Sequence, residues 1–208
     1  MAGVMDVGLT LVVDAAKGYV AEKLLEPALA PIWSLVKSIF LPRWDPALDE
    51  IRLNLAEAVE KRRAADRQYD ARLAASLQRD EARSLVTQLT RAAAQATTED
   101  RMKMLAAAAA GVFTPDLDSE MRSRVSRAVE QLEPSDVIAL RRVNEAFARG
   151  ENVQQVEGTP QNRTALVQFG CLNIAAGAGY RSLHEPTPLG LGVLKALEDW
   201  PRVPAPRS

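Results

Sequence analysis

The sequence predicts a mostly α-helical protein: a helical bundle with one long helix and a small α+β module at the C-terminal end. Of the 208 residues, 47% are hydrophobic but only 5% are aromatic, and alanine, leucine, arginine and glutamate are abundant. This composition favours helices over sheets. Helix-capping residues recur ahead of apolar stretches with helical spacing. Short segments around a glycine turn predict strands only near the C-terminal end.

Residues 1–44 are expected to form apolar N-terminal helices. Charged side chains recur through residues 3–26, and the apolar run at residues 32–41 covers about ten residues, too few to cross a bilayer. Three roles stay open for this run: a buried helix, a partner-binding helix, or a helix on a membrane surface. The N-terminal end carries no positively charged stretch of the kind that begins a secretory signal, so we expect a cytoplasmic protein.

Residues 45–96 predict one long, charge-rich helix. Asp45 is a suitable N-cap and Pro46 a suitable first helical residue, and no glycine or proline follows within the segment. Apolar residues recur at spacings of three or four along one face. Between Glu60 and Arg72, however, almost no aliphatic side chain is present. We expect this polar waist to be the most solvated part of the helix, with both apolar ends packed on neighbouring helices.

Residues 97–150 predict a helical bundle with recognisable starts and stops. Thr98 and Asp118 are expected N-caps, a third helix is expected to begin at Pro134, and Gly150 is expected to end it with Phe147 facing inward. The alanine run at residues 106–110 permits close approach of a neighbouring backbone.

The alternating carboxylates Asp116, Asp118 and Glu120 do not form a calcium-binding EF-hand loop. The sixth position of such a loop would be Met121 where glycine is required, and the twelfth would be Arg127 where glutamate is required. We therefore interpret Asp118 as a helix cap.

The C-terminal part is expected to divide into a linker at residues 151–158, a module at 159–200 and a disordered tail at 201–208. The module begins with a Thr-Pro helix start, continues with a predicted β-hairpin, and ends with a helix that Thr187 and Pro188 begin. This order resembles the second half of a winged-helix domain. In a DNA-reading winged helix, the residues in position to contact nucleic acid would be Gln161, Asn162 and Arg163.

No catalytic, cofactor-binding or metal-binding set is found in the sequence. Cys171 is the single cysteine and is expected to be a small core residue, and His184 is the single histidine, so neither a disulfide nor a histidine metal pair can form within the chain. The glycines do not follow the order of a phosphate-binding loop. Acidic and basic residues are balanced along the whole chain, with a net charge of −1, so a polybasic nucleic-acid-binding segment is absent.

The layout of the chain resembles bacterial proteins of the abortive-infection-alpha type. The resemblance rests on an apolar N-terminal segment with Leu-Glu-Pro-Ala-Leu at residues 25–29, a long charged helix, an alanine-rich helix near Leu105, a Leu-Glu-Pro-Ser-Asp junction at 132–136, and Thr-Pro-Leu-Gly at 187–190. The resemblance implies a role in phage defence or stress response and no particular reaction.

We therefore expect a non-enzymatic helical protein-interaction protein that binds a protein partner or a second copy of itself, with no cofactor and no small-molecule substrate inferred. Alternatives are a winged-helix DNA-binding regulator and a membrane-associating effector acting through residues 3–41; binding to nucleic acid or to a membrane surface is not favoured. The expected interaction residues are all large and apolar: Trp33, Val36, Phe40, Leu85 and Leu89.

Overall fold

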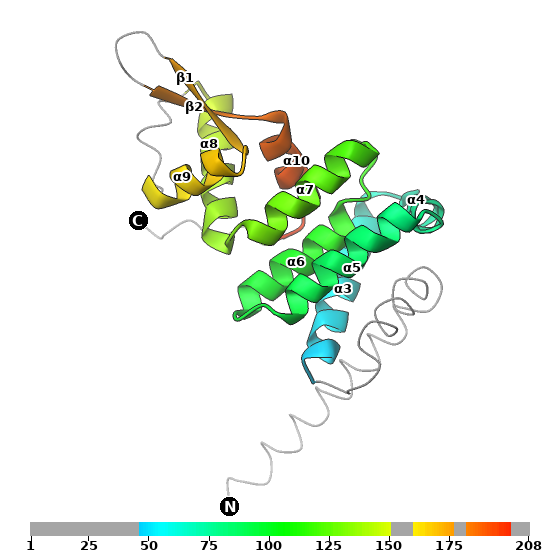
Figure 1. Ribbon diagram of the computed structural model, residues 1–208. Coiled ribbons are helices and arrows are strands. Elements are labelled where there is room, and N and C mark those ends of the chain that lie inside the picture. The colour runs from blue at the N-terminus through cyan, green and yellow to red at the C-terminus, as the bar shows by residue number, and fades with distance from the viewer. Residues whose placement is uncertain (1–45, 151–159, 177–181, 201–208) are drawn as a thin grey trace, which may run out of the picture.

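The computed structural model describes residues 46–150, 160–176 and 182–200, and these are mostly helical, as predicted (Figure 1). The predictions for residues 1–44, for the linker at 151–158 and for the tail at 201–208 lie outside the described residues. The described elements follow in chain order: α3 (Pro46–Ala65), α4 (Tyr69–Leu77), α5 (Asp80–Ala94), α6 (Glu99–Gly111), α7 (Ser119–Gln131), α8 (Pro134–Ala148), α9 (Pro160–Gln168), β1 (Leu172–Ala176), β2 (Ser182–Pro186) and α10 (Pro188–Ala196).

Helix α6 forms the centre of the described structure. Every residue from Met104 to Gly111 is buried, and the helix packs against α3 and α5, with further contacts to α7, α8 and α10 (Figure 1). Thr98 caps the helix as predicted, because its side chain accepts a hydrogen bond from the Arg101 backbone N–H at 3.3 Å. The alanine run lets neighbouring helices approach on several sides, so α6 can be enclosed by the rest of the fold.

The prediction of one helix over residues 45–96 is wrong, because the chain forms three helices there. The first break follows Ala65, where the Asp66 side chain accepts a hydrogen bond from the Gln68 backbone N–H at 2.9 Å and so stabilises a turn. The second break is at Arg79, whose backbone is extended, and α5 begins at Asp80 with two acidic residues in its first turn. Both breaks occur without glycine or proline.

The polar waist is mostly exposed or half-buried, in keeping with the expectation, but two of its side chains belong to the interior. Arg62 is only 7% exposed and Tyr69 only 1%. The waist forms the corner between α3 and α4, so its polar residues allow the chain to turn and bring both apolar ends, in α3 and α5, onto the same central helix α6.

Helices α7 and α8 begin as predicted. The Asp118 carboxylate accepts a hydrogen bond from the Met121 backbone N–H at 2.7 Å, which confirms Asp118 as the N-cap of α7. Helix α8 starts at Pro134, and Gly150 follows its end with a left-handed φ of 67°. Phe147, expected to face inward, is instead 50% exposed, because Val143 and Ala146 carry the buried face of the last turns of α8.

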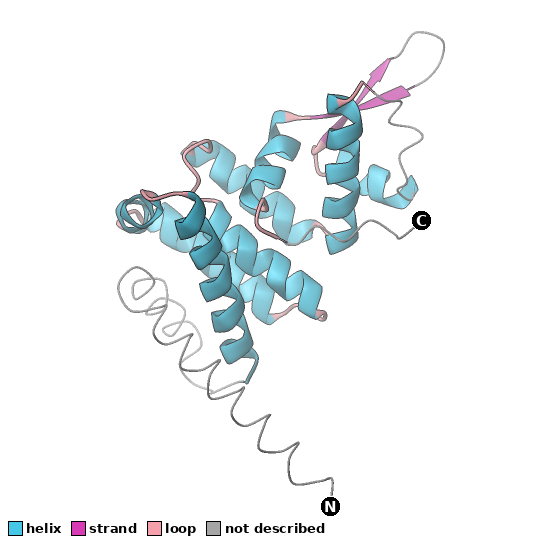
Figure 2. Cartoon of the chain, turned by 180° about the vertical axis from the view of Figure 1, so that it is seen from behind, coloured by secondary structure: helices cyan, strands magenta, loops and turns pink. Residues whose placement is uncertain are grey.

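The predicted β-hairpin is present at one end of the molecule, as Figure 2 shows from behind. Strands β1 and β2 pair antiparallel in a register that sets Leu172 opposite Pro186 and Ile174 opposite His184. Thr187 caps α10 as predicted: its hydroxyl accepts from the Gly190 backbone N–H at 3.0 Å and donates to the Gly170 carbonyl at 2.6 Å.

One hydrophobic core extends through the described helices and β1. Buried side chains of α9, β1 and α10, among them Leu166, Leu172 and Val193, belong to the same cluster as Leu105 of α6. Cys171 is fully buried in this cluster, which confirms its predicted role as a core residue. The position of α10 relative to α3 and α6 is therefore defined by packing, and this position creates the polar contacts described next.

Candidate functional site

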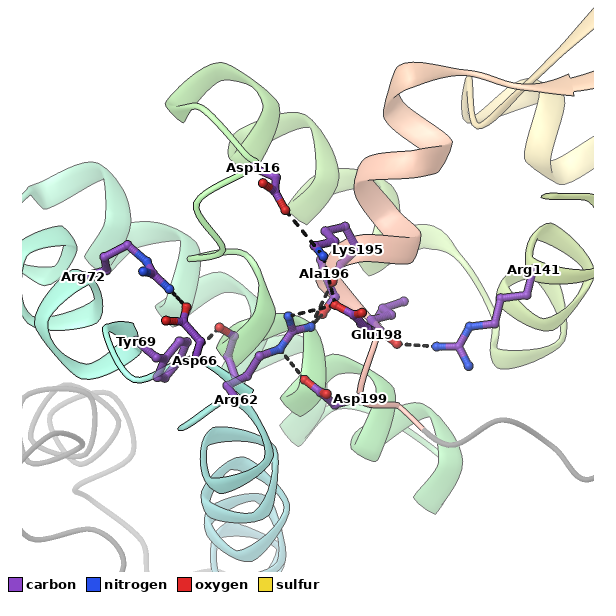
Figure 3. A network of polar contacts seen from close by, with 12 residues as sticks. Arg62, Asp66, Tyr69, Arg72, Asp116, Arg141, Lys195, Ala196, Glu198 and Asp199 are labelled. Atoms are coloured by element: carbon purple, nitrogen blue, oxygen red, sulfur yellow. Dashed lines mark hydrogen bonds and ion pairs between the residues drawn. The ribbon is translucent and has the colours of Figure 1, made fainter. Parts of the chain in front are cut away.

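The end of α10 is bound by an arginine from the other end of the described chain (Figure 3). Arg62, in the last turn of α3, donates from Nη2 to the Lys195 carbonyl at 2.9 Å and to the Ala196 carbonyl at 3.0 Å. Its Nε forms an ion pair with Asp199, and its Nη1 lies 3.8 Å from Glu198 Oε2. The last carbonyls of a helix have no partner within the helix. The Arg62 guanidinium therefore provides both a hydrogen-bonding cap and a favourable charge at the negative end of the α10 dipole.

The backbones of α6 and α10 meet beside this arginine. A Cβ atom on Gly111 would lie 1.8 Å from the Ala196 carbonyl oxygen and 2.9 Å from Arg62 Nη2, so only glycine fits at this position. One residue earlier, the Ala110 carbonyl accepts a hydrogen bond from the Tyr69 hydroxyl at 2.8 Å. Burial raises the pKa of Tyr69, so its hydroxyl remains protonated and can act as this donor.

A second arginine binds the residues that follow α10. Arg141 of α8 donates from Nη1 to the Trp200 carbonyl at 3.0 Å and from Nη2 to the Leu197 carbonyl. Its guanidinium carbon lies 5.8 Å from the centre of the Trp200 ring, a cation–π distance. Residues 195–200 are thus bound from two sides by side chains that carry permanent positive charge.

A cavity of about 120 Å³ lies between α3, α6 and residues 199–200. Its walls combine a buried amide, two alanines, an indole and four charged side chains: Asn54, Ala58, Ala107, Trp200, Glu57, Lys61, Lys103 and Asp199. Asn54 is 8% exposed, and its Nδ2 has no hydrogen-bond partner. A buried donor without a partner is costly, so this amide is the feature of the cavity that most needs a ligand or water.

A wider groove of about 310 Å³ lies between α8 and α10. Leu191 and Leu194 provide its apolar surface, and Leu191 is 48% exposed. Charged and polar side chains of both helices surround these leucines: Arg141, Asn144, Glu145, Lys195 and Glu198. Lys195 lies 3.2 Å from Glu198 and 3.5 Å from Asp116, and the hydrogen bond to Glu198 raises the pKa of Lys195.

The residues expected to contact nucleic acid lie together on α9, but only Gln161 is exposed, and Asn162 and Arg163 are half-buried. Asn162 donates to Asp136 Oδ1 at 2.7 Å and to Ser135 Oγ at 3.1 Å, so its amide binds the start of α8. Arg163 is half-buried and lies close enough to His184 of β2 to act on its charge. Burial and the positive charge of Arg163 together lower the pKa of His184, so this histidine is neutral at pH 7.

Of the predicted interaction residues, Leu85 and Leu89 are 7% and 0% exposed. Leu89 belongs to the hydrophobic core, and Leu85 lines a small pocket with Ser119 and Arg122 of α7, so both are too buried to offer a partner a broad apolar surface. Trp33, Val36 and Phe40 lie outside the described residues. The large apolar side chains that the described surface does expose are Phe147, Ile174 and Leu191.

Cys171 is buried, and its burial raises the pKa of the thiol to about 11. A thiol with this pKa remains protonated at neutral pH and is a poor nucleophile. Within residues 46–150, 160–176 and 182–200, no group of three or more histidine, cysteine, aspartate or glutamate side chains is placed to hold a metal ion.

Asn54, Arg62 and Trp200 are site residues that were not predicted from the sequence, although the pattern of α3 contains a signal for two of them. Arg62 occupies an apolar position of the helical stripe, four residues after Ala58, and Asn54 lies three residues after Ile51 on the same face. A polar residue at a core-facing position indicates a buried polar contact. The carbonyls that Arg62 binds, however, lie 133 and 134 residues away, and nothing in the sequence identifies them.

No helix among the described residues combines the length and the apolar character needed to cross a bilayer. Comparisons of the chain with protein-family models, with curated proteins and with solved structures each return no significant match.

Proposed function

We propose that the chain is a non-enzymatic helical protein-interaction protein whose contact surface is the groove between α8 and α10. The observation that carries this proposal is the exposed Leu191, which lies beside Leu194 within a rim of charged residues of both signs. An apolar centre with a polar rim is the usual composition of a protein interface. The groove is also preorganised, because Arg62 and Arg141 hold the end of α10 in place, and a preformed surface costs less entropy on binding.

The partner that fits this groove is an amphipathic helix. Its apolar residues would cover Leu191 and Leu194. Its charged residues would meet Lys195 and Glu198, which carry opposite charges. Helix-in-groove binding of this kind places residues at i, i+3, i+4 and i+7 in the groove. The helix can belong to another protein or to a second copy of the chain.

The experiment compares position 191, in the groove, with position 174, outside it. Ile174 is 59% exposed on β1, so it is a similarly accessible apolar residue outside the groove. A photo-crosslinking amino acid at position 191 is expected to capture a protein or a second copy of the chain in the native cell, whereas the same amino acid at position 174 is not. Equal capture at both positions, or no capture at position 191, would overturn the proposal.

A role in phage defence or stress response is the second part of the proposal, and the resemblance to abortive-infection-alpha-type proteins supports it. The groove provides a direct test in cells. If the role depends on the proposed contact, Leu191→Asp removes protection in a plaque assay and Ile174→Asp retains it. Equal plaque counts with and without the wild-type chain would contradict the defence role while leaving the interaction itself open to the crosslinking test.

A winged-helix DNA-binding regulator is the second candidate function. Its support is the order of elements, since α9 directly precedes an antiparallel hairpin that leads into the capped helix α10. The accessible base-contacting residue would be Gln161, because Asn162 already binds Asp136. A gel shift at two salt concentrations tests this candidate: DNA binding must occur and must weaken in Arg163→Gln. The absence of a shift at low salt excludes it.

A further inference from the structure

We infer that the cavity between α3, α6 and residues 199–200 binds a small, neutral molecule with an amide-like edge and a flat ring. Neither a small-molecule substrate nor a cofactor follows from the proposed protein-interaction function, so this site is independent of it. The inference rests on three properties of the cavity, which are its unpartnered amide, the pairing of its charges and its size.

The unpartnered amide belongs to Asn54. This side chain lines the cavity and is 8% exposed, and its Nδ2 makes no hydrogen bond. The last torsion of an asparagine is soft, so the amide can turn either its donor or its acceptor toward the cavity. A ligand with an adjacent acceptor and donor, such as a carboxamide, satisfies both atoms at once.

The charged groups of the cavity already have partners in the protein. Lys61 Nζ lies 2.7 Å from Glu57 Oε1, Lys103 is paired with Glu99, and Asp199 is paired with Arg62. The hydrogen bond that Lys103 donates to Glu99 raises the pKa of Lys103, so this lysine remains charged at neutral pH. A charged ligand would have to displace one of these pairs, whereas a neutral ligand leaves all three intact.

The size and the apolar walls indicate a ring. The volume of about 120 Å³ is somewhat smaller than an engineered cavity of about 150 Å³ in another protein that binds benzene. Ala58, Ala107 and Trp200 are at most 7% exposed and supply apolar wall. One aromatic ring with a single polar substituent therefore matches both the space and the chemistry.

Such a ligand would contact α3 and the end of the chain at the same time. Asp199 and Trp200 are also the residues that Arg62 and Arg141 bind. Occupancy of the cavity would thus stabilise residues 195–200 in their position, and with them the α10 side of the proposed interaction groove. The binding of a small molecule and the binding of a partner would be coupled through these residues.

Nicotinamide and nicotinate are the test probes. Both contain the same pyridine ring, but nicotinamide carries a neutral carboxamide where nicotinate carries a charged carboxylate. Ligand-observed NMR with the full chain is expected to show nicotinamide binding in the millimolar range, as for a fragment of this size, and weaker binding of nicotinate. At 10 mM, nicotinamide is expected to raise the Tm by about 3 °C.

Asn54→Leu keeps the volume of the side chain and removes the amide, so it is expected to weaken nicotinamide binding about tenfold or more. Asn173→Leu makes the same change on β1, away from both the cavity and the groove, and is the control, expected to bind as the wild type does. Nuclear Overhauser effects between the ring protons of nicotinamide and the methyl groups of Ala58 and Ala107 locate the ligand in the wild-type chain, whatever the variants do to folding.

The inference is overturned if neither probe binds at 10 mM, which would mean a cavity filled with water only. It is also overturned if Asn54→Leu binds nicotinamide as the wild type does, or if no Overhauser effect reaches Ala58 and Ala107. Tighter binding of nicotinate that Lys103→Met abolishes would show instead that the lysines recognise an anion. None of these outcomes depends on whether position 191 captures a partner, so the cavity and the groove are tested separately.

Discussion

Helices α9 and α10 are joined to the rest of the protein by polar contacts of opposite character. At the α10 attachment, defined by Arg62, Gly111 and Arg141 with residues 195–200, two guanidinium groups bind backbone carbonyls beside a backbone approach that admits no Cβ atom. The α9 attachment is defined by Asn162 and Arg163 with Asp136 and His184. Here the half-buried amide of Asn162 donates to the Asp136 carboxylate, and the charge of Arg163 lowers the pKa of His184.

The difference shows how burial sets the strength of a polar contact. Arg62 is 7% exposed, so its loss removes from the interior the donor that the Ala196 carbonyl and Asp199 now have, whereas the Lys195 carbonyl also accepts from the Glu198 backbone N–H. The α9 contacts are partly solvated, and water can replace much of what a substitution removes. The first attachment is therefore expected to determine the free energy of unfolding, and the second to determine how the protein responds to pH.

The largest effect is expected for Gly111→Ala at the α10 attachment. The new Cβ would lie 1.8 Å from the Ala196 carbonyl oxygen, so α10 must be displaced, and we expect a loss of about 3–5 kcal/mol in the free energy of unfolding, measured in urea. Gly150→Ala is the control: its φ of 67° is strained for alanine but no atom lies within 4 Å, so the cost should be about 1 kcal/mol. Equal costs for the two variants would show that the contact between α6 and α10 is not tight.

Arg62→Met is expected to lower the free energy of unfolding by about 3 kcal/mol, because the Ala196 carbonyl and Asp199 lose their partner and the Lys195 carbonyl loses one of its donors. Arg63→Met, at the neighbouring position, removes ion pairs with Glu60 and Asp70 that are more exposed and should cost about 1 kcal/mol or less. The urea midpoints of the two variants show which substitution costs more stability. A larger shift for Arg63→Met would contradict the larger contribution assigned to Arg62.

Arg141→Met tests the other side of residues 195–200. The substitution removes hydrogen bonds to the carbonyls of Leu197 and Trp200 and the contact with the Trp200 ring. We expect a cost of about 1–2 kcal/mol, smaller than that of Arg62→Met, because Arg141 is only half-buried. Hydrogen exchange of the amides of residues 195–200 should increase in this variant; unchanged exchange there would contradict the role given to Arg141.

Asn162→Ala is expected to have a smaller effect at the α9 attachment. Loss of the 2.7 Å hydrogen bond to Asp136 should cost about 1 kcal/mol by thermal or urea unfolding. Asp136 retains its other hydrogen bond, which it accepts from the Glu133 backbone N–H at 2.9 Å, so the start of α8 should remain intact in circular dichroism. A cost above that of Arg62→Met would contradict the ranking of the two attachments.

The smallest effect concerns pH. The pKa of His184 is lowered in the folded state by burial and by Arg163, while the unfolded chain keeps a pKa of about 6.5. Below about pH 6.5 the unfolded state therefore binds more protons, and stability falls as the pH drops toward the folded pKa. Arg163→Gln should raise the pKa of His184 and reduce this fall. His184 is the single histidine, so its proton NMR signal reports the pKa directly; an unchanged titration in Arg163→Gln would exclude the influence of Arg163.

The sequence predicted those features whose signals are local. Thr98, Asp118 and Thr187 cap helices as expected, because a capping side chain and the amide that it binds are only three residues apart. The β-hairpin and the buried Cys171 were likewise indicated by short segments.

The features that the sequence did not predict depend on distant partners. The break after Ala65 has no glycine or proline, and it is stabilised by a turn at Asp66 and by tertiary contacts such as that of Tyr69 with Ala110. Arg62 binds carbonyls 133 and 134 positions later. Every residue carries a backbone carbonyl, so no side chain in the sequence marks these two as the acceptors. The cavity and the groove could not be predicted for the same reason, since each is assembled from helices that are separated in the chain.

The bond between Arg62 and Ala196 also has a consequence for the order of events during synthesis on the ribosome. Helix α3 leaves the ribosome long before α10, because 134 residues separate the two partners. Until α10 arrives, Arg62 must remain hydrated and the corner between α3 and α4 incomplete. Contacts between residues so far apart in the chain form late and slowly. A nascent chain that ends before residue 195 should therefore be recognisable by protease cleavage at this corner, and completion of α10 should make the corner resistant.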